Sequence, residues 1–123
     1  MKDPYLLPDF NRFKDSLKED SLVKSLPKKG SIRLGIFHFI KGYRKWDKIY
    51  YITNGNVETK SKRGDFDIWI HSDYVDNYNG KNLCDVIKSA REKGDLGENT
   101  KLTEKEIFFK YFKLISYRDC FGI

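Results

Sequence analysis

The stretch SIRLGIFHFIK, residues 31–41, decides the fold, because its side chains alternate between two faces and both faces are apolar. One face consists of Ile32, Leu34, Ile36, His38 and Ile40. The other face carries Phe37 and Phe39. A strand that is apolar on both faces is covered on both, so we predict a central strand of a sheet here. His38, between two isoleucines, is predicted to be a core histidine rather than a metal ligand.

Further strands and helices are predicted around this central strand. The strands are residues 48–53, 57–61 and 66–71, and the helices are residues 8–20, 21–26, 83–93 and 104–117. Asn54-Gly55 between the first two of these strands is a strong hairpin signal. Thr103 and Glu106 form a capping-box pattern, which favours helix for residues 104–117 although IFFKYFKLIS is also good strand material.

These elements predict a single domain over residues 1–123. The hairpin-length connections make the sheet mostly antiparallel. We therefore predict an α+β fold, with an antiparallel sheet of about four strands and with an N-terminal helix and two C-terminal helices packed on one face.

The composition points to a polyanionic partner. The net charge is +6, the pI is about 9.2 and aromatic residues make up 15% of the chain. A basic excess favours nucleic acid or an acidic protein surface, although a lysine-rich surface without a partner has the same composition. The sequence has neither an apolar signal segment nor an 18-residue apolar run, so we expect a cytoplasmic protein without a membrane partner.

Cysteine is sparse, with only Cys84 and Cys120 and no CxxC motif. Thiols kept reduced in the cytosol are the simpler interpretation, and one disulfide is the alternative. Cys84 lies beside the apolar stripe of a helix, which indicates a structural rather than a catalytic cysteine.

The strand GDFDIWIHSD, residues 64–73, presents polar side chains on the face opposite its core residues. The polar face consists of Asp65, Asp67, Trp69 and His71. Asp67 and His71 lie about 13 Å apart along a strand, too far to share an ion, whereas Asp65 and Asp67 lie about 6.6 Å apart. The two carboxylates can hold a metal if Glu58 joins them from the next strand. Otherwise they form ion pairs with Lys60, Lys62 and Arg63. His38 becomes of interest only if it lies beside His71.

The segment IYYITNGNVETKS, with Glu58-Thr59-Lys60, resembles the catalytic hairpin of the PD-(D/E)xK nucleases within residues 46–61. The resemblance implies a metal ion, Mg²⁺ or Mn²⁺, bound by Glu58 and a second carboxylate, with Lys60 assisting the attacking water. Asp47 is the upstream candidate, and Trp46 replaces the proline of the family's Pro-Asp dipeptide. With Asn54-Gly55 as the turn, Tyr51 opposes Glu58, and Asp47 lies about 13 Å further along the strand. The other candidates for the second carboxylate are Asp65 and Asp67.

Basic residues alternate with aromatic residues at the turn after the central strand. The predicted nucleic-acid contacts are Lys41, Tyr43, Arg44, Lys45, Trp46 and Lys48, extended by Lys60, Lys62 and Arg63. Lysine and arginine bind phosphates, while Tyr43 or Trp46 stacks on a base. The alternative is an ordinary basic turn with Trp46 folded into the core.

The resulting hypothesis is a small non-enzymatic binding protein of a virus, phage or mobile element. It would act on nucleic acid or on a host nucleoprotein complex through its basic aromatic surface, without a cofactor. The first alternative is the metal-dependent nuclease described above. The second is an inhibitor or immunity protein that binds one partner protein.

Overall fold

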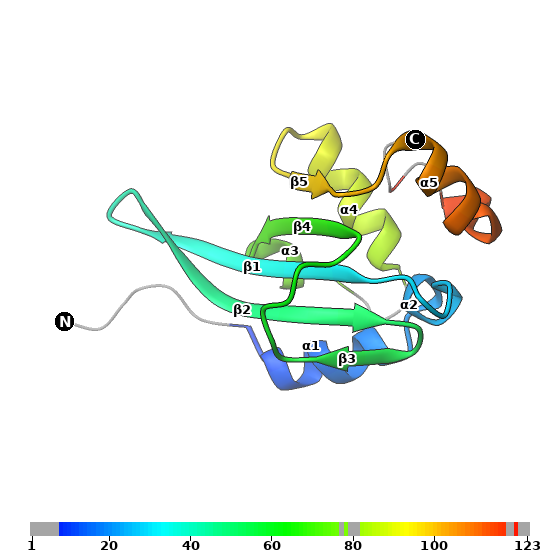
Figure 1. The fold of residues 1–123 in the computed structure, drawn as a ribbon. Helices are drawn as coiled ribbons and strands as arrows, with labels where there is room; N and C mark the ends of the chain where they lie inside the picture. The colour runs from blue at the N-terminus through cyan, green and yellow to red at the C-terminus, as the bar shows by residue number, and fades with distance from the viewer. Residues whose placement is uncertain (1–7, 77, 79–81, 118–119, 121–123) are drawn as a thin grey trace.

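The computed structural model describes residues 8–76, 78, 82–117 and 120. Two helices, α1 (Phe10–Lys18) and α2 (Ser21–Ser25), come first (Figure 1). The strands β1 (Ile32–Ile40), β2 (Tyr43–Thr53), β3 (Asn56–Glu58) and β4 (Phe66–His71) follow. The remaining elements are α3 (Asp73–Asp76), α4 (Leu83–Glu92), β5 (Gly97–Thr100), α5 (Glu104–Lys110) and the 3₁₀ helix η1 (Phe112–Tyr117).

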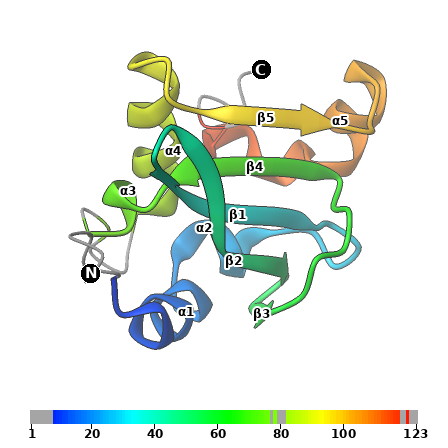
Figure 2. The same ribbon diagram turned by 90° about the vertical axis from the view of Figure 1, so that its left-hand side faces the viewer.

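The five strands form one sheet in the order β3-β2-β1-β4-β5, which runs from bottom to top in Figure 2. β1 lies at its centre, as the two apolar faces of this strand predict. β1 pairs antiparallel with β2, β2 with β3, and β4 with β5, whereas β1 and β4 are parallel. The α+β class and the mostly antiparallel sheet are therefore confirmed.

The predicted number of four strands is wrong, because β5 adds a fifth. Its sequence, GENT, is polar and mostly exposed, since the strand pairs along one edge only. Such an edge strand shows no apolar alternation, so its sequence alone predicts a loop. The parallel pair was also not predicted. The chain passes through β2 and β3 between β1 and β4, and a connection of this length permits a crossover.

One face of the sheet packs against the helices and forms the core. Ile32, Leu34 and Ile36 of β1 are fully buried there, together with the helical residues Leu17 and Ile87. The helix predicted over residues 21–26 is present as α2. The predicted helical layout was incomplete, because α3 is an additional short helix and the last predicted helix is divided into α5 and η1. The capping box of α5 is confirmed: Thr103 Oγ1 accepts from the N–H of Glu106, and the Glu106 carboxylate accepts from the N–H of Thr103.

A disulfide joins Cys84, in α4, to Cys120 near the end of the chain. The two Cα atoms lie 5.2 Å apart, within the usual range for a disulfide. The expectation of two reduced cysteines is therefore wrong. The reason is tertiary, since the residues are separated by 36 positions and only the fold brings them together.

Candidate functional site

The face of the sheet opposite the core, called the open face below, is shaped by a β-bulge. Ile36 pairs with Lys48 but Phe37 pairs with Trp46, so Asp47 is the extra residue in β2. The bulge turns Trp46 onto the open face, where its ring contacts Phe37 at a centroid distance of 5.6 Å. Phe37 is buried but lies outside the core cluster.

Two glycines allow two tryptophan rings to lie against the sheet. A Cβ on Gly35 would come within 2.7 Å of the Trp46 ring, and a Cβ on Gly97 would overlap the Trp69 indole. Gly35 is the register partner of Trp69 across the parallel β1–β4 pair. Because Trp46 lies over β1 and Trp69 lies over β5, the sheet surface between them is left hollow. Glycine inside a strand is typical of such close approach.

A cleft of about 320 Å³ occupies this hollow. It is lined by Arg33, Gly35, Arg44, Trp46, Ile49, Ser61, Asp67, Ile68 and Trp69. The volume is at the lower end of the roughly 300–1,000 Å³ found for small-molecule sites, which combine apolar walls with a few polar groups. The cleft has this composition, since two indoles and two isoleucines line it beside two arginines, a serine and one carboxylate.

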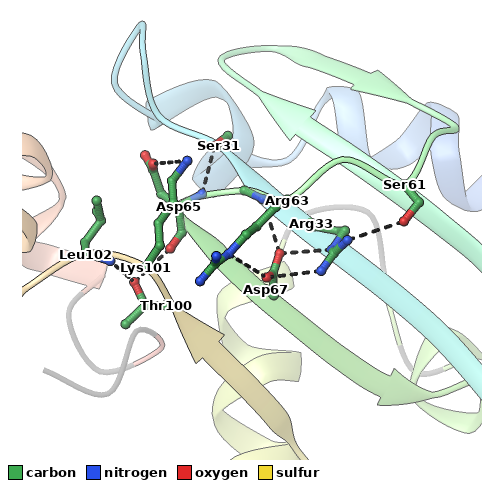
Figure 3. Close-up of polar contacts among 10 residues, drawn as sticks. Ser31, Arg33, Ser61, Arg63, Asp65, Asp67, Thr100, Lys101 and Leu102 are labelled. Atoms are coloured by element: carbon green, nitrogen blue, oxygen red, sulfur yellow. Dashed lines mark hydrogen bonds and ion pairs between the residues drawn. The ribbon is translucent and has the colours of Figure 1, made fainter.

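One end of the cleft is a fixed polar network (Figure 3). Arg33 donates to both carboxylate oxygens of Asp67, at 3.0 and 3.2 Å, and its Nη1 also lies 3.4 Å from the Ser61 hydroxyl. The backbone N–H of Gly64 donates to the same carboxylate at 3.2 Å, and Arg63 approaches it at 3.9 Å. Asp67 is only 6% exposed, so this end is rigid and its acceptors are occupied.

Arg44 lies at the rim of the cleft and has no ion-pair partner among the residues that the structure describes. Its guanidinium lies over the Phe37 ring at 4.4 Å and over the Trp46 ring at 5.5 Å. The lining thus carries two guanidinium groups and one carboxylate, an excess of one positive charge. Of these charges, the guanidinium of Arg44 is the one still able to bind an anionic group.

A second hollow of about 540 Å³ continues from Arg44 toward the end of β4. Its lining residues are Phe37, Phe39, Arg44, His71, Asp73, Tyr74, Lys93, Gly94 and Asp95. His71 packs against Phe37 and Phe39 with ring centroids 5.8 and 6.0 Å away, and its Nδ1 accepts from the N–H of Asp73. Arg44 belongs to both hollows and therefore lies between them.

The carboxylates that sequence reasoning grouped are held by separate partners. The Asp65 carboxylate accepts from the Tyr111 hydroxyl and from Lys110, both at 2.7 Å. The backbone of Asp65 binds the hydroxyls of Ser31 and Thr100, as Figure 3 shows. Desolvation by burial, followed by this carboxylate, raises the pKa of the Tyr111 hydroxyl. Asp67 binds Arg33 instead, so Asp65 and Asp67 do not act as a pair.

The hairpin register was predicted correctly, since Tyr51 lies opposite Glu58. Glu58 forms an exposed ion pair with Lys60 at 2.6 Å. The hydrogen bond from Lys60, followed by the positive charge of Lys60, lowers the pKa of Glu58. Asp47 is bound to His38 Nδ1 at 2.8 Å, with both side chains buried. In the described part of the chain, no three His, Cys, Asp or Glu residues gather closely enough to hold a metal ion.

The residues predicted to contact nucleic acid separate into two groups. Lys41, Tyr43, Arg44, Lys45 and Trp46 lie on the β1–β2 hairpin and are all exposed. Lys60 and Lys62 lie instead over the Tyr51 ring, each at 5.1 Å. His38 and His71 do not meet, because His38 binds Asp47 while His71 packs on the open face.

Sequence reasoning missed Arg33, Gly35 and Ile49 as site residues. The one signal in the sequence was Gly35, a glycine in the middle of an apolar strand, which indicates close approach of another group. Trp69 was placed on the correct face, but the space for its ring over Gly97 depends on the pairing of β4 with β5.

A solved structure resembles this fold over its whole length. The solution structure of sterol carrier protein domain 2 of Helicoverpa armigera matches 99% of this chain and 94% of its own, with a TM-score of 0.50 and 13% identical residues. The fold is similar to that of a sterol carrier protein domain. At this identity the likeness concerns the fold and not the ligand. No family model matches the sequence, and no curated protein does.

This likeness overturns the prediction of a small nucleic-acid-binding protein, because the similar fold is that of a domain named as a sterol carrier. The nuclease and inhibitor alternatives find no support in it either. The local resemblance of residues 46–61 to a nuclease hairpin is untouched by the comparison and stays a prediction. None of the helices in the described ranges has the length and apolar character needed to span a bilayer.

Proposed function

We propose that this protein binds a small amphipathic molecule, with a flat apolar body and an acidic end, in the cleft of the open face. The observation that carries the proposal is the hollow over Gly35 between Trp46 and Trp69, with Arg44 at its rim. Flat apolar groups pack well between aromatic rings. The similarity to a sterol carrier protein domain supports a lipid-like ligand.

The charges of the cleft favour an acidic end. Asp67 is occupied by Arg33 at 3.0 and 3.2 Å, so its negative charge is neutralised where it faces the cleft. Arg44 lies over the Phe37 and Trp46 rings and has no carboxylate partner among the described residues, and a guanidinium binds a carboxylate through two parallel hydrogen bonds. A ligand carboxylate at Arg44 leaves its tail in the hollow between Trp46 and Trp69.

The test uses cis-parinaric acid, a fluorescent fatty acid with a flat conjugated tail, as the probe. Saturable binding is expected, with energy transfer from the two tryptophans to the probe. The methyl ester should bind about tenfold more weakly than the acid, because it cannot form the charged hydrogen bonds to Arg44.

Two variants locate the binding. Gly35→Val fills the floor of the cleft and should weaken binding at least tenfold, since a Cβ there already meets the Trp46 ring at 2.7 Å. Arg44→Gln should remove the preference for the acid over the ester. Phe109→Ala, at a surface-exposed aromatic residue of α5 that does not line the cleft, is the control and should bind as the wild type does. Equal affinity of wild type and Gly35→Val would refute the site.

A further inference from the structure

The β1–β2 hairpin projects beyond the rest of the sheet as a two-stranded arm, residues 38–46. β4 pairs with β1 only as far as Phe37, and β3 pairs with β2 only from Tyr51 onward. Among the described residues, the arm's strands therefore pair only with each other, and Figure 1 shows the arm extending away from the other elements. Its turn is Lys41-Gly42, with φ of 52° and 82°, which is typical of a tight two-residue hairpin.

The arm exposes large aromatic side chains on both of its sides. Phe39 is 54% exposed, Trp46 45% and Tyr43 80%. Phe39 pairs with Arg44 and the next pair is Ile40 with Tyr43, so these pairs point to opposite sides of the ribbon. Phe39 contacts His71 on one side, but more than half of its surface and most of Tyr43 stay exposed, and exposed apolar patches of this kind mark interaction sites.

The charges on the arm are all of one sign. Lys41, Arg44 and Lys45 are exposed, and within the described ranges none of them pairs with a carboxylate. The carboxylate closest in sequence, Asp47, is bound to His38 at 2.8 Å and buried. The arm therefore combines three uncompensated cations with tyrosine, tryptophan and phenylalanine.

We infer that the arm docks on an anionic lipid bilayer surface. Tyrosine and tryptophan favour the headgroup region of a bilayer, and each nearby lysine adds attraction to anionic lipids. This peripheral binding needs no spanning segment, so the absence of an apolar run in the sequence does not exclude it. The inference rests on the proposed function, because Arg44 and Trp46 line the cleft at the base of the arm and place its opening next to the bilayer.

The experiment is flotation of the full-length protein with vesicles of phosphatidylcholine alone or with one quarter phosphatidylserine. Wild type should float with the anionic vesicles only. Lys41→Gln/Lys45→Gln should lower the vesicle partition coefficient about fivefold for each lysine removed. Tyr43→Ala should lower it severalfold without changing charge. Both variants should fold normally, because the altered side chains are exposed.

Matched controls remove the same groups elsewhere. Lys28→Gln/Lys29→Gln removes two exposed lysines from the loop before β1, and Phe109→Ala removes an aromatic ring that is 69% exposed on α5. Both should float within twofold of the wild type. Loss of flotation in Phe109→Ala but not in Tyr43→Ala would overturn the inference in favour of the α5 surface.

Separate measurements test ligand binding in the cleft and docking of the arm on a bilayer, so either proposal can be refuted without the other. Tyr43, Lys41 and Lys45 do not line the cleft, so their variants should keep wild-type affinity for soluble cis-parinaric acid. Probe binding without flotation of the wild type would overturn the docking inference and leave the cleft intact. Binding of a single-stranded oligonucleotide that depends on Tyr43, with no flotation, would overturn it in favour of a polynucleotide.

Discussion

Asp20 illustrates how much a single side chain depends on the fold. In the sequence it ends a charged run, yet it is fully buried. Its carboxylate accepts from the N–H of Leu22 at 2.9 Å, from the N–H of Leu83 at 2.8 Å and from the Tyr78 hydroxyl at 2.6 Å. Asp20 thereby begins α2 and binds this helix to the start of α4.

Replacing Asp20 by alanine should lower the free energy of unfolding by about 2–4 kcal/mol, because three buried donors lose their acceptor. Asp15→Ala, at an exposed aspartate of α1, is the matched control and should change it by less than about 0.5 kcal/mol. Urea unfolding followed by circular dichroism measures both. Equal midpoints for the two variants would contradict the role given to Asp20.

At the scale of elements, helices and strands with a regular apolar pattern could be predicted from the sequence, whereas the strand at the edge of the sheet could not. β1, β4, α1 and α4 each carry a clear apolar pattern, because one side of each packs on the core. β5 lacks that pattern, since it lies at the edge of the sheet. The bulge at Asp47 had no sequence signal, yet it decides that Trp46 lies on the open face. The candidate site was thus less predictable than the elements that carry it.

The disulfide ties α4 to Cys120. It closes a segment of 36 positions, and the loop-entropy relation for such a segment gives about 3–4 kcal/mol of stabilisation. Adding dithiothreitol should therefore lower the urea midpoint of the wild type.

Cys84→Ser/Cys120→Ser should start at the lower midpoint and should not respond to the reductant. A wild-type midpoint that is the same with and without reductant would contradict a formed disulfide. The reduced wild type keeps both sulfurs, so its comparison with the double serine variant separates the loss of the bond from the loss of the sulfurs.

At the scale of the whole molecule, buried tyrosines make the fold sensitive to alkali. Burial raises the pKa of Tyr50 to about 12, and its hydroxyl lies 3.4 Å from the carbonyl of Phe10. The unfolded chain ionises tyrosine near pH 10. The contribution of Tyr50 to stability is therefore complete below about pH 10 and is lost as the pH rises toward 12.

Between pH 10 and 12 the wild type should lose about 1–2 kcal/mol more of its unfolding free energy than Tyr50→Phe, which has no ionisable hydroxyl at this position. Urea unfolding at intervals across this window measures the difference. Curves that remain parallel for the two proteins would show that Tyr50 ionises equally in the folded and unfolded states.

The sequence by itself determined the α+β class, the central position of β1, the hairpin register and the capping box of α5. Each of these depends on residues close together in the chain, whose spacing sets the direction of their side chains. Only the tertiary structure decided the parallel β1–β4 pair, the disulfide and the cleft over Gly35. These features join residues far apart in the chain. Their positions follow from strand pairing and packing, which local spacing does not encode.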